Sequence, residues 1–345
     1  MSQTTRPPRW EPDVAVRPYT PADEAAVIGL LQTCLEGWRT AEAVQRFRWK
    51  HEHSPFGESQ RVVAVAGGRI VAFMAWMAWR VVYDGQEFVA WRGTDLAVDP
   101  AMQRQGVFQQ IRRYRAQCPE EQDLSFNHRN ERSDGAMRKA GAAGGRRLTR
   151  HLAPLRPLQI VAWQRSGRPG SARCDAFASV DEVLEDEAAA EDLLSRAVPT
   201  GRLATARSVA LLRWRYAQFP GRRYVGHELR EGDGRLRGLL IGRCAPGTER
   251  SPAYFEVSEL IVPEDDRAAM RRLLRRVLRV RAPYAAVVLP MPFRSGWEAL
   301  AAGFPVAREG GWLFGAWALR DGPVLAEDLG DPRRWMLPLG DLEAV

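Results

Sequence analysis

Apolar and polar positions along the first part of the chain separate into strand-like and helix-like runs. Residues 14–17 alternate as a half-buried strand does. A helix start follows, with Thr20 as N-cap, Pro21 at the first helical position and an acidic residue, Asp23, at the third. The next apolar side chains recur at helical spacing, at Val27, Leu30, Leu31 and Cys34. The pattern therefore predicts a strand followed by an amphipathic helix.

The same reasoning extends to about residue 163. Glycine-containing turns at 67–68 and 84–85 separate apolar runs into strands. The expected elements are a helix over 41–51, strands over 61–66, 69–80 and 86–98, a helix over 107–117, a strand over 124–127, a short helix over 134–140, and strands over 145–152 and 158–163. This order predicts a fold of the α/β class, with an α+β mixed sheet flanked by helices.

Four short sequences occur twice in the same order, 162 to 166 residues apart. The pairs are Arg48–His51 with Arg213–Tyr216, Gly68–Val71 with Gly234–Arg237, Asp95–Val98 with Glu259–Val262, and Ala140–Ala142 with Ala302–Phe304. A nearly constant spacing indicates an internal duplication. We therefore expect two tandem domains of one fold, residues 1–165 and 166–345, joined by a glycine- and proline-containing linker over 165–174. The second copy of the pattern spans about 180–319, and an acidic helix over 181–192 opens it.

The most informative segment runs from Asp95 to Arg113. It consists of a buried strand that ends at a proline, a polar loop with one glycine, and a basic helix. Free backbone N–H groups and the positive end of the helix dipole form an anion site in such a segment. Gly106 supplies the backbone freedom of a close approach, and Arg104 adds a positive charge. Neither Gly-Lys-Ser/Thr nor Gly-x-Gly-x-x-Gly is present, which excludes the commoner phosphate loops.

This segment resembles the pyrophosphate-binding segment of the GNAT superfamily of acyl-CoA-dependent N-acyltransferases. The family pattern is Val-x-Pro followed by Gln/Arg-x-x-Gly-x-Gly/Ala, and residues 98–100 and 103–108 match it, except that Phe108 stands where a small residue is usual. The resemblance implies that acetyl-CoA is the co-substrate, in a gap between the fourth and fifth strands. It assigns the pantetheine and thioester to the backbone of Leu96, Ala97 and Val98. It assigns the pyrophosphate to Gln103, Arg104, Gln105, Gly106, Val107 and Phe108, and a further CoA contact to Asn130.

The candidates for a general base are Asp95, on the strand beside the cofactor, and His128, after the next strand. The alternative readings are a solvated or capping carboxylate and a loop histidine. His51 and His53 lie near the helix where the family builds its acceptor site. Their side chains either line that pocket or lie on the surface. In the family a tyrosine serves as the general acid. The corresponding position in this sequence is Met137, on a helix expected to be partly exposed. Either another group protonates the leaving thiolate, or the domain binds CoA without turnover.

The second copy lacks the anion motif. After Val262 and Pro263 it continues with Glu264, Asp265 and Asp266, without a glycine. Three carboxylates at this position repel a pyrophosphate. The second domain is therefore expected to be degenerate, so that the chain binds CoA only in the first.

The formal charge of +8 and the pI near 9.8 raise the question of nucleic acid as a partner. Lysine occurs only at Lys50 and Lys139, and the arginines are spread along the chain with modest clusters, which argues against a selected basic surface. The four cysteines form no Cys-x-x-Cys pair, so we expect free thiols and no metal site. No signal peptide and no membrane span are visible, which favours a cytoplasmic protein without a membrane partner.

The leading hypothesis is transfer of an acetyl group from acetyl-CoA to the amine of a small molecule. Two alternatives are transfer of another acyl or aminoacyl group on the same fold and a non-catalytic CoA-binding or regulatory protein, which Met137 favours. Salt-sensitive RNA or DNA binding would indicate a nucleic-acid role instead. The sequence leaves open the acceptor, the acyl chain and the oligomeric state.

Overall fold

The computed structural model describes residues 14–117, 123–129, 131–139, 145–168, 170, 173–249, 251–280, 284–290, 296–319, 329–336, 338 and 341. Its strands are β1 (Ala15–Pro18), β2 (Gln60–Ala66), β3 (Arg69–Tyr83), β4 (Gln86–Val98), β5 (Leu124–Arg129), β6 (Arg146–Pro154), β7 (Ala178–Ser179), β8 (Leu203–Thr205), β9 (Val225–Arg230), β10 (Leu236–Ala245), β11 (Tyr254–Ile261), β12 (Ala286–Pro290), β13 (Val306–Ala318) and β14 (Trp335–Met336). Its α-helices are α1 (Glu24–Cys34), α2 (Ala43–His51), α3 (Val107–Ala116), α4 (Glu131–Lys139), α5 (Pro157–Ser166), α6 (Val180–Val183), α7 (Glu187–Arg196), α8 (Val209–Leu212), α9 (Arg267–Arg279) and α10 (Gly296–Ala301). The short helical turns are η1 (Pro21–Asp23), η2 (Glu36–Trp38), η3 (Pro100–Met102), η5 (Pro332–Arg334) and the π-helical turn η4 (Arg213–Ala217).

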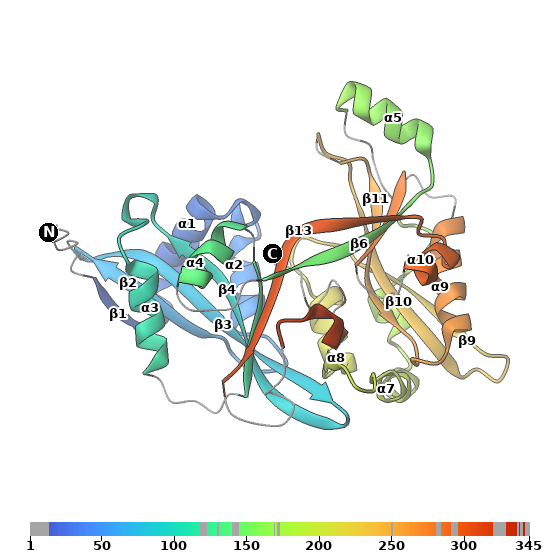
Figure 1. The fold of residues 1–345 in the computed structure, drawn as a ribbon, viewed down its shortest axis with the longest axis horizontal. Coiled ribbons are helices and arrows are strands. Elements are labelled where there is room, and N and C mark those ends of the chain that lie inside the picture. Colours follow the sequence, from blue (N-terminus) through green and yellow to red (C-terminus); the bar gives the residue numbers. More distant parts are fainter. Residues whose placement is uncertain are drawn as a thin grey trace, which may run out of the picture.

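The strands of the described residues form one mixed sheet, in the order β1-β2-β3-β4-β5-β13-β6-β12-β11-β10-β9-β7 (Figure 1). The order is pseudo-symmetric. Each strand of the first copy lies as far from one end of the sheet as the equivalent strand of the second copy lies from the other end. The β4–β5 and β11–β12 pairs are parallel, and the other pairs along this path are antiparallel. The predicted mixed sheet and the equal strand order of the two copies are confirmed.

The two copies exchange their last strands. β6, from the first copy, pairs with β12 of the second, and β13, from the second copy, pairs with β5 of the first. β6 and β13 also pair with each other at the centre of the sheet. The boundary near residue 165 stays a prediction from the sequence, and in space each repeat supplies a strand to the other.

Two repeat-equivalent tryptophans meet between the copies. Trp49 on α2 and Trp214 in η4 stack with ring centroids 4.6 Å apart and planes 14° from parallel. The Trp49 indole N–H donates to the Trp214 carbonyl oxygen at 2.8 Å, and the Trp214 indole N–H donates to the Trp49 carbonyl oxygen at 3.0 Å. A residue that contacts its own equivalent reciprocally lies on a two-fold axis. The pair therefore marks the pseudo-two-fold axis of the duplicated fold.

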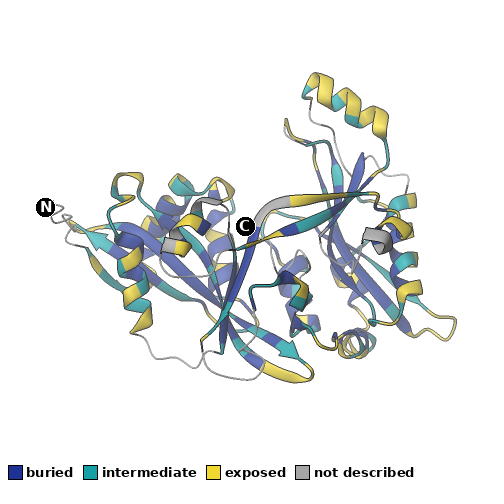
Figure 2. Ribbon diagram, in the orientation of Figure 1, coloured by how far each residue is buried: buried dark blue, intermediate teal, exposed yellow. Residues whose placement is uncertain are grey.

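Helices cover both faces of the sheet in the first copy. Side chains of α1 and α2 pack on one face with Phe73 and Ala97, and α3 packs on the other with Val62 and Met74. Because both faces are covered, β3 is buried almost without a break along its centre, as Figure 2 shows for the middle of the sheet. The core at the junction of the copies is apolar and continuous, so the two halves share one interior.

The predicted strand over 158–163 is wrong, because the segment forms the helix α5. Pro157 occupies the first turn of α5, and Gly167 ends the helix in the left-handed conformation. A short apolar run does not distinguish a strand from a helix, and these two end signals decide the matter here. None of the side chains of α5 is buried, and the helix stands off the body beyond the end of β6 (Figure 1). The acidic helix expected over 181–192 is divided between α6 and α7.

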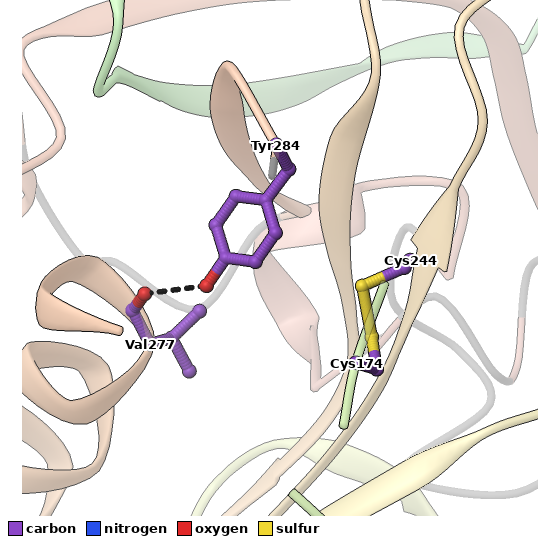
Figure 3. Close-up of a disulfide and its surroundings, with 4 residues drawn as sticks. All are labelled: Cys174, Cys244, Val277 and Tyr284. Atoms are coloured by element: carbon purple, nitrogen blue, oxygen red, sulfur yellow. Dashed lines mark hydrogen bonds between the residues drawn. A yellow bond between two sulfur atoms is a disulfide. The ribbon is translucent and has the colours of Figure 1, made fainter. Parts of the chain in front are cut away.

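The expectation of free thiols also needs a correction. Cys174 and Cys244 form a disulfide across 70 residues, in the second copy beside the Tyr284 ring (Figure 3). Their partners in space could not be read from spacing, because the chain returns along β10 to bring Cys244 to the segment before β7. Cys34 is a free thiol, and Cys118 lies outside the described residues. No helix among the described residues is long and apolar enough to cross a membrane.

Candidate active site

The loop after β4 is fixed by its own side chains. The Asp99 carboxylate accepts a hydrogen bond from the Ala101 amide at 2.9 Å and begins η3. The Gln103 side-chain amide donates to the Val98 carbonyl at 3.1 Å, and that of Gln105 donates to the Ala101 carbonyl at 2.6 Å. Gln103 thus ties the loop to the end of β4 and Gln105 ties it to η3, which explains why polar side chains with amide donors occupy these positions.

Two residues of this loop adopt the left-handed conformation. Arg104 has φ 64° and Gly106, the N-cap of α3, has φ 86°. The first amides of α3, those of Val107 and Phe108 among them, have no acceptor within the helix and form its positive end. A Cβ added at Gly106 would meet no atom within 4 Å, so the space in front of this amide cluster is open. The loop therefore fits the oxygen atoms of a diphosphate.

β4 and β5 separate beside this loop. Their parallel pairing runs from Ala90–Leu124 to Arg92–Phe126, and no further pair is formed among the described residues of the two strands. β4 continues to Val98, with Leu96, Ala97 and Val98 along the unpaired stretch. The gap that the resemblance implied between the fourth and fifth strands is thus present in the sheet. Asn130, predicted as a further CoA contact, lies outside the described residues.

A β-bulge interrupts β4 at the start of this unpaired stretch. Phe73 pairs with Ala97 and Ala75 pairs with Thr94, so Asp95 and Leu96 together oppose the single residue Met74. Asp95 has φ 53°, a left-handed conformation that is uncommon for a residue other than glycine. The bulge therefore turns the backbone of Asp95 and Leu96 out of the regular ladder.

The Asp95 carboxylate is buried in a group of polar side chains. Its Oδ2 atom lies 2.6 Å from Lys50 Nζ and 3.1 Å from His51 Nε2, both on α2. Its Oδ1 atom accepts from the Trp38 indole N–H at 3.2 Å. Lys50 Nζ also donates to Thr94 Oγ1 at 2.8 Å. The five residues join η2 and α2 to the bulge of β4.

Charge pairing sets the protonation of this group. Burial by itself raises the pKa of the Asp95 carboxyl, but the charge of Lys50 and the hydrogen bond with His51 outweigh burial and leave the pKa below its ordinary value. Burial lowers the pKa of Lys50 to about 8 against the opposing effect of Asp95. An ionised carboxylate with a lowered pKa is a weak base. The surroundings of Asp95 thus favour an anchor over the role of general base, which stays a prediction.

His128 lies on β5, on the other side of the gap. Its Nδ1 atom is 3.3 Å from an Arg92 guanidinium nitrogen, and Arg92 itself is buried over the Trp79 ring. A guanidinium only donates, so Nδ1 accepts and the proton of the neutral ring is on Nε2. Burial, together with the positive charge of Arg92, lowers the pKa of His128 well below its ordinary value. In this state His128 presents an N–H donor at Nε2, and its role as a base is likewise untested.

We expect His128 to weaken the fold in acid. The pKa of the ring is lowered in the folded state, so below pH 6.5 the unfolded chain binds a proton that the folded chain excludes. The free energy of unfolding should therefore drop more between pH 7.5 and 5.5 in the wild type than in His128→Gln. Urea unfolding at the two pH values measures this difference. An equal drop in both proteins would show that His128 titrates normally.

The remaining candidates take other places. His51 is fully buried against Asp95, and His53 is exposed on the surface. Met137 on α4 is buried rather than partly exposed, and it packs in one apolar cluster with Phe108. This cluster explains the large residue at a usually small position, since the Phe108 ring fills the space under α3 and α4. Lys50 was missed as a site residue, although it is one of two lysines and lies in a repeated motif.

The equivalent place in the second copy is filled by the chain itself. The Asp266 carboxylate accepts from the Ala269 amide in the first turn of α9 at 2.9 Å and also binds Arg237. Glu264 pairs with Arg202 at 2.7 Å. Two of the three carboxylates thus have partners, and one of them caps the helix end where an anion would bind. The described residues contain no group of three or more His, Cys, Asp or Glu side chains that could hold a metal ion.

The loop after β4 and the gap between β4 and β5 are the features that the resemblance to the GNAT superfamily implies. Residues 15–127 match the family model of the acetyltransferase (GNAT) domain, a range that contains β1 to β4, the loop and α3. This match, over part of the first repeat, agrees with the GNAT superfamily predicted from the loop. No curated protein matches the sequence.

Several solved structures share the fold over most of the chain. A protein of unknown function from Enterococcus faecalis V583, described as a probable N-acyltransferase, is 13% identical with a TM-score of 0.63, over 88% of this chain and 72% of the other. A GCN5-related N-acetyltransferase from Anabaena variabilis is 11% identical with a TM-score of 0.62, over 89% and 73%. Saccharomyces cerevisiae N-myristoyltransferase with bound myristoyl-CoA is 10% identical with a TM-score of 0.57, over 100% and 92%. At these identities the likeness concerns the fold alone.

Proposed function

We propose that the first repeat binds acetyl-CoA and transfers its acetyl group to the amine of a small molecule. The observation that carries the proposal is the loop from Gln103 to Phe108, whose left-handed Gly106 opens the amide end of α3 beside an unpaired stretch of β4. The second repeat lacks this loop and caps the equivalent helix with Asp266. We therefore infer one CoA site in each chain.

Different segments of the first repeat bind different parts of acetyl-CoA. The amides of Val107 and Phe108 and the Arg104 charge hold the pyrophosphate, and the backbone of Leu96, Ala97 and Val98 holds the pantetheine and thioester. The neutral amine attacks the thioester carbon, a C–N bond forms, the C–S bond breaks, and CoA leaves as a thiolate. The attacking nitrogen releases one proton, and the thiolate takes one up. Holding both substrates supplies much of the rate.

The protein groups for these proton transfers follow from the same geometry. Asp95 and His128 are the candidates for the base predicted from the sequence, and both lie at the gap, on β4 and β5; the ion pair with Lys50 favours an anchoring role for Asp95. Met137 has no proton to give and is buried in the core, so the thiolate takes its proton from water. The rate should then rise with pH through the ionisation of the amine, without a second limb from a protein acid.

A second candidate is a non-catalytic CoA-binding protein, which the burial of Met137 at the position of the family's acid favours. A longer acyl group on the same fold is the other alternative, since one structural neighbour binds myristoyl-CoA. All three share the anion loop and differ in whether the thioester is cleaved and in which acyl chain is accepted.

Thiol release separates these functions. We expect free CoA to appear when the protein is mixed with acetyl-CoA and a panel of small amines, and to appear more slowly with acyl-CoA of longer chain. Calorimetry on the same protein measures CoA binding without turnover. Binding without thiol release from any acyl-CoA would indicate the non-catalytic function. Faster release from a longer acyl-CoA would exclude acetyl specificity.

A further inference from the structure

The bulge in β4 is held in a strained conformation. Asp95 has φ 53° in a place where an extra residue interrupts the ladder, and glycine is the usual residue for such a conformation. A left-handed residue with a side chain costs about 1–2 kcal/mol and persists only when its surroundings hold it. Backbone strain of this kind is concentrated at functional sites.

The holding contacts come from outside the sheet. Lys50 and His51 on α2 contact one oxygen of the Asp95 carboxylate, and the indole N–H of Trp38 in η2 donates a hydrogen bond to the other. The side chains of Lys50 and His51 are 3% and 0% exposed, so these contacts are not screened by water. Ser59 Oγ lies 3.0 Å from His51 Nδ1 and fixes the ring from its other side. The carboxylate is therefore clamped at both oxygens, and through it the backbone of residue 95.

The second repeat has an equivalent buried acid but not the left-handed backbone conformation. Glu259 is the repeat equivalent of Asp95, and Tyr216 is the equivalent of His51. Their side chains again form a buried pair, with the Tyr216 hydroxyl donating to Glu259 at 2.8 Å. β11 also has a register shift here, but Glu259 is absent from the residues of positive φ in the described chain. A buried acid anchored by the helix is thus common to both repeats, whereas the left-handed bulge occurs only beside the anion loop.

We propose that Asp95, clamped by Lys50, His51 and Trp38, is a positioning residue that fixes the β4 bulge and aims the Leu96 N–H at the thioester oxygen of bound acyl-CoA. This inference rests on the proposed acyl transfer. A fixed N–H at that point stabilises the negative charge that develops on the thioester oxygen. The carboxylate acts through the backbone and takes no proton from the amine. Lys50 therefore helps to position the bulge through Asp95. It is not among the catalytic residues predicted from the sequence.

Substitutions at residue 95 distinguish positioning from base catalysis. Asparagine tolerates the left-handed conformation and keeps one oxygen, which can still accept a hydrogen bond from Lys50, so Asp95→Asn should lower kcat by less than about tenfold. Valine does not tolerate it, so Asp95→Val should lower kcat by about 10²–10³-fold, with the KM for acyl-CoA changed little. If Asp95 were the base, both variants would lose activity alike, by about 10²-fold or more. Equal losses would overturn the inference.

Lys50→Met tests the clamp without changing residue 95. Removing the Lys50 charge returns the pKa of Asp95 toward its ordinary value and would make it a better base. Positioning predicts instead a loss of kcat of about 10²-fold, because the bulge is released. The matched control is Glu259→Gln, which neutralises the equivalent buried acid of the second repeat and should leave kcat within about twofold. A gain of activity in Lys50→Met would overturn the inference.

The infrared band of the thioester carbonyl gives a readout that needs no turnover. With isotopically labelled acetyl-CoA, the band should shift to lower frequency on binding to the wild type, and the shift should be absent in Asp95→Val at unchanged CoA affinity. An unshifted band in a wild-type complex that calorimetry shows to form would overturn the positioning role alone. No acyl-CoA binding at all would overturn the proposed function and the inference with it.

Discussion

Replacement of Gly106 by glutamate is expected to abolish CoA binding while the protein stays folded. Gly106 has φ 86° at the N-cap of α3, and the space before its Cα is open. Glutamate therefore fits sterically, but it brings a negative charge to the amide end of the helix, where we propose that the diphosphate binds. A side chain in this conformation also costs about 1–2 kcal/mol. We expect the dissociation constant for CoA to rise by about 10²-fold or more, as measured by calorimetry.

A matched control separates the local effect from strain. Gly85, in the turn between β3 and β4, has φ 80° and equally open surroundings, at the opposite end of β4. Gly85→Glu carries the same backbone strain and charge, so it should lower the melting temperature similarly and leave CoA affinity unchanged. Gly106→Ala adds the strain without the charge and should weaken binding only a few-fold. Unchanged affinity in Gly106→Glu would place the CoA site elsewhere.

The course of the loop between β4 and α3 could be predicted because its determinants are local. A proline ends the strand, Gly106 takes a conformation that other residues avoid, and the helix follows within the same short segment. The duplication was visible for a related reason, since Trp49 and Trp214 keep both their sequence context and their place in the fold. Local signals were sufficient where proline and glycine mark the ends of an element, whereas the apolar run at 158–163, read without its end signals, was mistaken for a strand.

The exchange of strands could not be predicted, because it depends on contacts between distant segments. β6 and β13 have similar strand patterns, and nothing within either one states whether it pairs with its own repeat or with the other. The clamp on Asp95 was hidden for the same reason. Lys50 is 45 residues from Asp95, and only the packing of α2 on β4 brings its ammonium group to the carboxylate. Burial then changes the chemistry of the carboxylate, which its residue type does not reveal.

Trp49→Ala should destabilise the whole protein by about 3–5 kcal/mol, the cost of emptying a fully packed tryptophan site. Trp49 is buried between the repeats, where it stacks on Trp214 and packs against Phe219. Its loss also leaves the Trp214 carbonyl without the indole donor. Because β6 and β13 join the two repeats in one sheet, we expect a single unfolding transition that moves as a whole in urea.

A double-mutant cycle with Trp214→Ala tests the pseudo-symmetric contact itself. The two rings stack, and each indole donates a hydrogen bond to the backbone of the other residue. The free energy of unfolding lost in the double variant should therefore be smaller than the sum of the two single losses, by at least about 1 kcal/mol. Trp163→Ala is the matched control, because the Trp163 indole also donates to a backbone carbonyl, that of Thr248, but lies on the exposed helix α5. It should cost less than about 1 kcal/mol. If Trp49→Ala cost no more than this control, or if the two repeats unfolded in separate transitions, the tryptophan pair would not be the element that unites the two copies into one cooperative unit.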